Sequence, residues 1–83
     1  MWYVYFLRLS NGDIYVGSTN DLKRRTKSHQ GGQVISTRNA GPLSLAAYVA
    51  VPGERAAREF ERYFKSGSRK AFAKKRFLTT DLT

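Results

Sequence analysis

The stretch MWYVYFLRLSNGDIYVGST, residues 1–19, decides the fold of this chain. Apolar and aromatic residues fill it on both sides of Asn11-Gly12, a pair typical of tight β-hairpin turns. Residues 2–9 and 13–18 are therefore predicted to form two antiparallel strands. Tyrosines at positions 3, 5 and 15 stand on these strands, and the turn geometry determines which of them share a face.

Two turn geometries fit this hairpin. A two-residue loop pairs Tyr15 with Arg8 and places Tyr5 and Tyr15 on opposite faces. A three-residue loop, with Gly12 in the left-handed region, pairs Tyr15 with Leu7 and puts Tyr5 and Tyr15 on one face. Apolar residues occupy both faces in either register, so the hydrophobic pattern leaves the choice open. A site that uses the two tyrosines together requires the three-residue loop.

Turn residues and apolar spacing divide the rest of the chain into alternating elements. A helix from about 20 to 30, a loop over 30–42, a strand over 43–51, and helices over 54–65 and 69–78 are predicted. The apolar residues expected to face inward from the last two helices are Ala57, Phe60, Phe64, Phe72 and Phe77. The order β-β-α-β-α-α predicts an α+β fold, a small three-stranded antiparallel sheet flanked by helices.

The composition favours a basic globular domain with a polyanionic partner. The 83 residues suffice for one domain, expected to span residues 1–83. Fifteen Lys and Arg against six Asp and Glu give a net charge of +9, which favours nucleic acid over a membrane surface. The absence of cysteine fits a reducing cytoplasm, and no secretory signal or membrane-spanning segment is expected.

Three side chains on the predicted helices suit phosphoryl transfer to water. Arg25 and His29 are four residues apart and share a helix face, where a guanidinium can bind two phosphate oxygens at once. Glu61 stands among apolar neighbours and offers a hard oxygen ligand for Mg²⁺. Together with Tyr5 and Tyr15, these residues form a candidate site for cleaving phosphodiester bonds.

Each assignment has a rival. Arg24 competes with Arg25 for the phosphate, and Glu59 competes with Glu61 as the metal ligand. His29 also suits a cation at the end of its helix, stabilised by the helix dipole. Glu61 also suits a surface ion pair with Lys65, one helical turn away.

The motifs resemble those of the GIY-YIG nuclease superfamily, or URI domain. Residues 3–5 (YVY) and 15–17 (YVG) resemble its two strand motifs, GSTNDLKRRTKSHQGG resembles its arginine–histidine helix, and EFERYFKSGSRK resembles its glutamate helix. The match covers about residues 2–76 and is to the small stand-alone bacterial type, related to the N-terminal nuclease domain of UvrC-type repair enzymes. This chain departs from the family pattern in having Tyr3 in place of the first glycine and no asparagine after Glu61.

The resemblance implies a Mg²⁺- or Mn²⁺-dependent DNA endonuclease, used in repair or processing, with one metal ion held by Glu61. It assigns catalytic roles to Tyr5, Tyr15, Arg25 and His29. Gly17 is expected to allow close packing of the strand end against the first helix.

Further basic residues are expected to contact the nucleic-acid backbone. These are Arg24, Lys27, Arg38, Lys65, Arg69, Lys70, Lys74 and Lys75. Since the chain has no separate recognition motif, specificity is expected from substrate shape, a protein partner or self-association. Two other functions fit the same features: a non-catalytic nucleic-acid-binding or regulatory module, and a basic adaptor for a larger protein.

Overall fold

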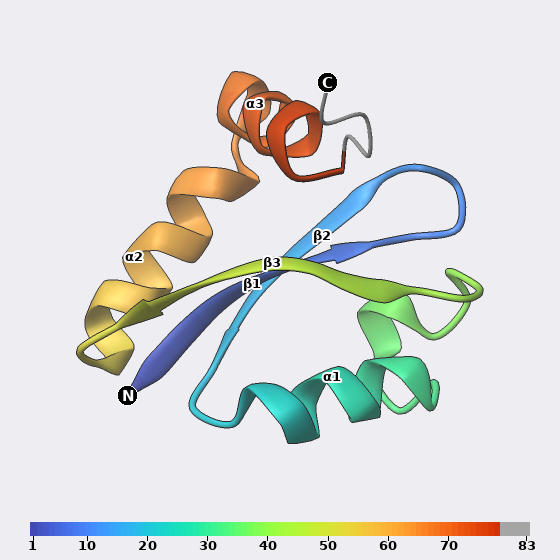
Figure 1. The fold of residues 1–83 in the computed structure, drawn as a ribbon, viewed down its shortest axis with the longest axis horizontal. Helices are drawn as coiled ribbons and strands as arrows, with labels where there is room; N and C mark the ends of the chain where they lie inside the picture. Colours follow the sequence, from blue (N-terminus) through green and yellow to red (C-terminus); the bar gives the residue numbers. More distant parts are fainter. Residues whose placement is uncertain (79–83) are drawn as a thin grey trace.

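The fold is that of a computed structural model, which describes residues 1–78. Its elements are β1 (Trp2–Arg8), β2 (Ile14–Thr19), α1 (Leu22–Gln30), the short 3₁₀ helix η1 (Ile35–Thr37), β3 (Ser44–Val51), α2 (Glu54–Lys65) and α3 (Gly67–Leu78). The predicted α+β class and element order are confirmed (Figure 1). The predicted loop over 30–42 proved partly wrong, because it contains η1.

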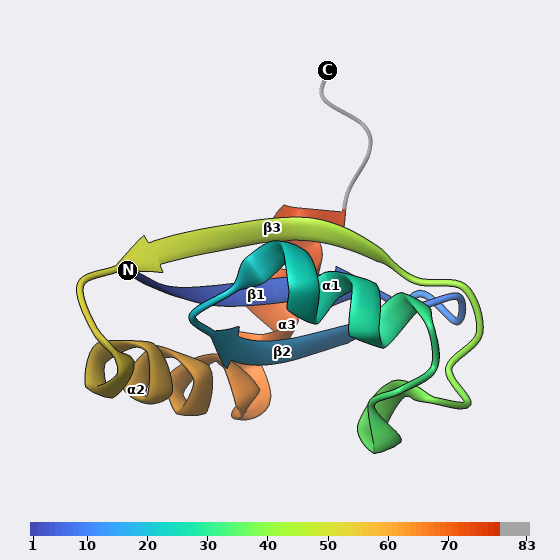
Figure 2. The ribbon, with the colours of Figure 1, turned by 90° about the horizontal axis from the view of Figure 1, so that it is seen from below.

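The strands form an antiparallel sheet in the order β2-β1-β3, with β1 in the centre. The helix α1 covers one face, whereas α2 and α3 lie on the other, so the molecule has three layers (Figures 1 and 2). The chain leaves β2 at one end of the sheet and enters α1 directly. Within residues 1–78, no helix has both the length and the apolar character needed to span a bilayer.

The hairpin adopts the three-residue loop. Tyr15 lies opposite Leu7 across the β1–β2 ladder, and Gly12 has φ = 85°, in the left-handed region that favours glycine. The Gly12 amide donates to the Leu9 carbonyl at 3.0 Å, which closes the turn. Tyr5 and Tyr15 therefore share one face, which is the register that a joint site requires.

The opposite face of the hairpin forms the hydrophobic core with α2 and α3. Val4, Phe6, Ile14 and Val16 are at most 2% exposed and pack with Ala57 of α2 and Ala73 of α3. Burial of this apolar surface is the main stabilising contribution to the fold.

Two of the aromatic residues predicted to face inward do not. Phe60 is 43% exposed and Phe72 is 54% exposed, because the small side chains of Ala57 and Ala73 are what meet the sheet. Phe64 packs on the core as predicted, and Phe60 stacks on its outer side. The side chain of Phe77 lies outside the described residues.

The helix boundaries differ slightly from prediction. The helix α1 begins at Leu22 rather than near residue 20, since Asp21 is its N-cap and accepts a hydrogen bond from the Arg24 amide at 3.1 Å. The helix α3 begins at Gly67, so the break after α2 is confined to Ser66.

Candidate active site

A buried hydrogen-bond network joins the tyrosine face of the sheet to α1. The Tyr5 hydroxyl lies 2.9 Å from His29 Nε2, and Arg25 Nε donates to the same hydroxyl at 3.4 Å. Tyr5 is 1% exposed and His29 is 2% exposed, whereas Arg25 is exposed overall. The predicted pairing of Arg25 and His29 on one helix face therefore places both residues on the Tyr5 hydroxyl.

Gly17 makes room for Tyr5. The two residues are paired across β1 and β2, and a Cβ at position 17 would collide with the Tyr5 hydroxyl and ring. This corrects the sequence-based expectation that Gly17 serves packing against α1. The glycine lets a tyrosine ring lie flat across the neighbouring strand, where its hydroxyl reaches His29 and Arg25.

The His29 imidazole is neutral at physiological pH. Burial, and then the nearby positive charge of Arg25, lower the pKa of His29 to about 4. Its second ring nitrogen, Nδ1, lies 2.7 Å from the hydroxyl of Thr37 in η1. His29 is therefore not a dipole-stabilised cation, and that rival assignment is wrong. Sequence analysis missed Thr37 because a lone threonine in a glycine-rich loop carries no local signal.

Acid should destabilise the fold through His29. Because the folded protein binds the imidazole proton less readily than the unfolded chain, unfolding takes up a proton between pH 6.5 and 4. Stability should fall as the pH drops through that range, by about 2 kcal/mol at pH 5 relative to pH 7.5. Urea denaturation of wild type and His29→Gln at both values tests this. An equal loss in the variant would contradict it.

The two tyrosines occupy different environments. Burial raises the pKa of Tyr5 despite the hydrogen bond from Arg25, so this hydroxyl stays protonated and positions Arg25. Tyr15 is half-buried, and its hydroxyl has no hydrogen-bond partner among the described residues. Its ring lies 5.0 Å from the His29 ring and 5.9 Å from Lys65 Nζ. Tyr15 is thus the tyrosine that can contact a ligand or an attacking water.

Glu61 is held from two sides at the edge of β2. Ser18 donates to Oε1 at 2.5 Å, and Lys65 Nζ lies 2.6 Å from Oε2. Burial acts to raise the pKa of Glu61, but the hydrogen bonds from Lys65 and Ser18 outweigh it and keep the pKa below its usual value. The carboxylate is ionised, and the Glu61–Lys65 pair exists as the rival reading predicted. Sequence analysis assigned Ser18 no role at the site and missed this contact.

A polar pocket of about 320 Å³ opens where β2 passes into α1. Arg24 and Arg25 of α1 and Arg58 of α2 line it, together with Ser18. Arg58 is paired with Glu54 at 3.1 Å and Asp21 also lines the pocket, so Arg24 and Arg25 are the groups there that favour an anion. The rivals Arg24 and Arg25 therefore share the pocket, and Arg58 is a further basic residue that sequence analysis missed. Neither Glu61 nor its rival Glu59 lines this pocket. Glu59 is exposed, whereas Glu61 is half-buried and accepts a hydrogen bond from Ser18, which does line the pocket.

The other predicted backbone-binding residues are dispersed. Lys27 borders a groove beside α1, and Arg38 is exposed after η1.

The predicted residues of α3 lie elsewhere. Lys70 and Lys74 are 4.0 and 3.9 Å from the Asp13 carboxylate, at the end of β2 opposite Ser18. Arg69 stacks on Tyr63, and Lys75 is exposed on α3. The fold thus brings Arg24 and Lys65 to the site and leaves the α3 residues at the other end of β2.

The donor set around Glu61 suits a hard cation with few protein ligands. Among the described residues, no three His, Cys, Asp or Glu side chains lie close enough together to hold a metal ion. Glu61 supplies an ionised carboxylate, and Mg²⁺ is commonly bound by one or two carboxylates with water and phosphate oxygens completing its shell. The residues therefore fit a magnesium ion that is bound together with a phosphate.

Sequence comparison places the chain among known proteins. The family model of the GIY-YIG catalytic domain matches residues 1–76. A UPF0213 protein of Cupriavidus pinatubonensis is 41% identical over 54 residues, covering 64% of this chain and 60% of that protein. A UPF0213 protein of Nitratidesulfovibrio vulgaris is 36% identical over 66 residues, covering 78% of this chain. The matched region spans 60% of the length of each of these two relatives.

Structure comparison gives a similar protein. The solution NMR structure of a UPF0213 protein from Bacillus halodurans matches with a TM-score of 0.57 and 34% sequence identity. The match covers 99% of this chain and 89% of that one. The names of these relatives state no activity.

Proposed function

Since the chain belongs to the GIY-YIG domain family, we propose that it is a metal-dependent endonuclease that hydrolyses DNA phosphodiester bonds. The observation that carries the proposal is the meeting of three features at the edge of β2. These are the guanidinium of Arg25 on Tyr5, the partly exposed Tyr15, and the ionised carboxylate of Glu61.

Arg25 is prepared to bind a phosphate. Its Nε is engaged by Tyr5, while its two terminal nitrogens have no partner among the described residues. A guanidinium in this state can donate two parallel hydrogen bonds to non-bridging phosphate oxygens and neutralise charge that develops on them. Tyr5 and His29 are positioning residues in this scheme, because both are buried below Arg25.

Tyr15 and Glu61 lie on either side of Lys65. Lys65 Nζ is 2.6 Å from the Glu61 carboxylate and 5.9 Å from the centre of the Tyr15 ring. The Tyr15 hydroxyl is free to accept a hydrogen bond from the attacking water and to direct it at the phosphorus. A Mg²⁺ ion at Glu61 would supply Lewis-acid polarisation of the scissile phosphate. Lys65, which pairs with this carboxylate in the structure, would then be available to the DNA backbone.

Arg25→Ala tests the proposal directly. Labelled duplex, nicked, branched and single-stranded DNA are incubated with wild type in Mg²⁺ and in EDTA. We expect metal-dependent cleavage by wild type and a loss of roughly 100-fold or more in the variant, the scale for removing one transition-state donor. Arg55→Ala removes the same charge from an exposed position on α2 and should cleave like wild type.

Two outcomes would reject the proposal. Cleavage that persists in Arg25→Ala at the wild-type rate would come from a contaminant. Binding of DNA by wild type without cleavage of any substrate would favour the non-catalytic binding module instead.

A further inference from the structure

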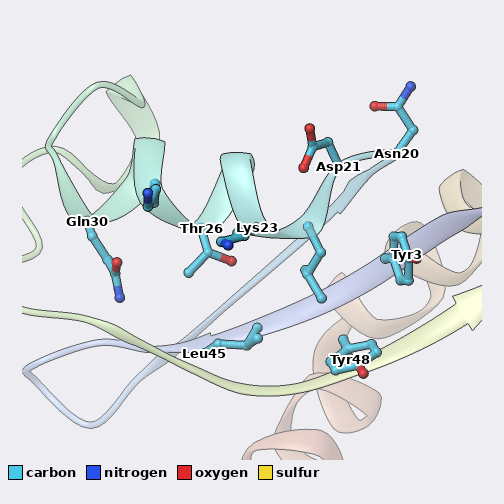
Figure 3. A pocket seen from close by; sticks show the side chains of 10 residues that line it. Tyr3, Asn20, Asp21, Lys23, Thr26, Gln30, Leu45 and Tyr48 are labelled. Carbon is cyan, nitrogen blue, oxygen red and sulfur yellow. The ribbon is translucent and has the colours of Figure 1, made fainter.

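A further cavity of the described chain is lined by none of the catalytic residues assigned above, and Lys27 borders it. It is a groove of about 610 Å³ between α1 and β3 (Figure 3). Tyr3, Leu45 and Tyr48 of the sheet form one wall, and Lys23 and Lys27 of α1 stand on the other. The helix contacts the hairpin through His29 and Tyr5 and also approaches β3, and the groove is the space that remains between its two walls.

The sheet wall is an aromatic surface open to solvent. Tyr48 is 54% exposed, and its ring meets that of Tyr3 edge-on, with centroids 5.9 Å apart. Tyr3 can therefore cover at most one face of the Tyr48 ring, and more than half of Tyr48 stays exposed. Every nucleobase can stack on such a face, whatever its sequence.

The helix wall is cationic and polar. Lys23 and Lys27 are one turn apart, and neither forms an ion pair within the described part of the chain. Gln30 adds a side-chain amide on the same wall (Figure 3). An exposed aromatic ring that faces unpaired cations and an amide suits a nucleotide whose base is unstacked from a duplex.

The groove adjoins the arginine pocket at the start of α1. Asn20 and Asp21, at the start of α1, line both cavities. The carboxylate of Asp21 is engaged as the N-cap of α1, which limits its repulsion of a passing phosphate. A strand with one phosphate at Arg25 can therefore continue around the helix N-terminus into the groove.

We propose that this groove binds an unpaired nucleotide, with its base stacked on Tyr48 and its phosphates on Lys23 and Lys27. A substrate preference for unpaired DNA rests on the proposed nuclease function. The existence of the binding site does not depend on that function. It means that the protein engages DNA with a frayed, flapped or single-stranded segment beside the phosphate at Arg25.

Binding in EDTA tests the inference without cleavage. The probe is a fluorescently labelled twelve-residue oligothymidylate, compared by anisotropy with a blunt duplex. Tyr48→Ala should weaken binding of the oligothymidylate about tenfold and leave duplex binding within about twofold. Tyr48→Phe should bind like wild type, since stacking needs the ring and not the hydroxyl. Phe72→Ala, which removes an equally exposed ring from α3, should have no effect.

A second measurement depends on neither stability nor cleavage. Photocrosslinking of 5-bromodeoxyuridine-substituted oligonucleotide, followed by peptide mapping, should identify Tyr48 or Tyr3. Unchanged oligothymidylate binding by folded Tyr48→Ala, an equal loss in Phe72→Ala, or crosslinks confined to other segments would each overturn the inference. Duplex cleavage with no single-strand binding would also overturn it while leaving the nuclease function intact. Single-strand binding through Tyr48 without cleavage of any substrate would support the binding site and reject the nuclease function.

Discussion

Glu61→Gln should abolish metal-dependent cleavage while leaving DNA binding in EDTA nearly unchanged. Glutamine keeps the shape of the side chain and an oxygen that can accept the Ser18 hydroxyl, but it loses the charge that a divalent cation requires. A bound metal contributes several kcal/mol to stabilising the transition state, so the rate should fall by roughly 10²–10⁴-fold. Cleavage rates across a Mg²⁺ titration, with binding measured in parallel, give both quantities.

The control for this variant is Glu59→Gln. Glu59 lies on the same helix and is exposed, so the substitution changes the net charge by the same amount away from the site. It should leave the rate and its Mg²⁺ dependence unchanged. If both variants lose activity equally, the effect comes from overall charge, and Glu61 is not the metal ligand. If Glu61→Gln cleaves at the wild-type rate, a metal ion held by this carboxylate is ruled out.

The fold was largely predictable because its signals are local. The Asn11-Gly12 pair, the cap residues before Leu22 and the Pro52-Gly53 break each mark a boundary within one or two residues of its place in the structure. The turn register was not settled by these signals, because both hairpin faces carry apolar residues. It depends on the left-handed conformation of Gly12 and on which face each helix covers.

Burial on the helices was less predictable. Periodicity correctly predicted that Ala57 and Phe64 face inward, but it missed Ala73, and it wrongly placed Phe60 and Phe72, which stay exposed. Small residues let the helix backbones approach the sheet closely, and the rings then lie at the sides. The helix face in contact with a sheet is set by the distance between the layers, which no residue pattern within one helix specifies.

The sequence predicted which residues make up the candidate site. The structure adds the residues that hydrogen-bond to them and hold them in place. Thr37 behind His29 and Ser18 on Glu61 come from distant segments, so their partners are decided by the folded arrangement. Arg58 is one of several exposed arginines in the sequence, and the fold brings it, beside Trp2, to a pocket that the start of α1 also lines. Residues that only position another residue are thus the hardest to predict from a single sequence.

Gly17→Ala should destabilise the protein and reduce cleavage, because the new methyl group occupies the path of the Tyr5 ring. The collision involves the hydroxyl and Cζ of a side chain that is 1% exposed, so the ring has little room to move. Such overpacking costs about 2 kcal/mol, a fall in melting temperature of roughly 10 °C. Displacing Tyr5 also displaces Arg25, and a misplaced phosphate-binding group costs about 100-fold in rate.

A double-mutant cycle isolates this cause. In a Tyr5→Leu background the obstructing hydroxyl and ring are gone, so Gly17→Ala should cost less than about 0.5 kcal/mol, a coupling of about 1.5 kcal/mol. Tyr5→Phe removes the hydroxyl alone and should give an intermediate coupling. Gly53→Ala, where nothing lies within 4 Å of the added methyl, should cost less than about 1 kcal/mol. Equal costs of Gly17→Ala in the wild-type, Tyr5→Phe and Tyr5→Leu backgrounds would show that the glycine serves the strand backbone rather than the tyrosine.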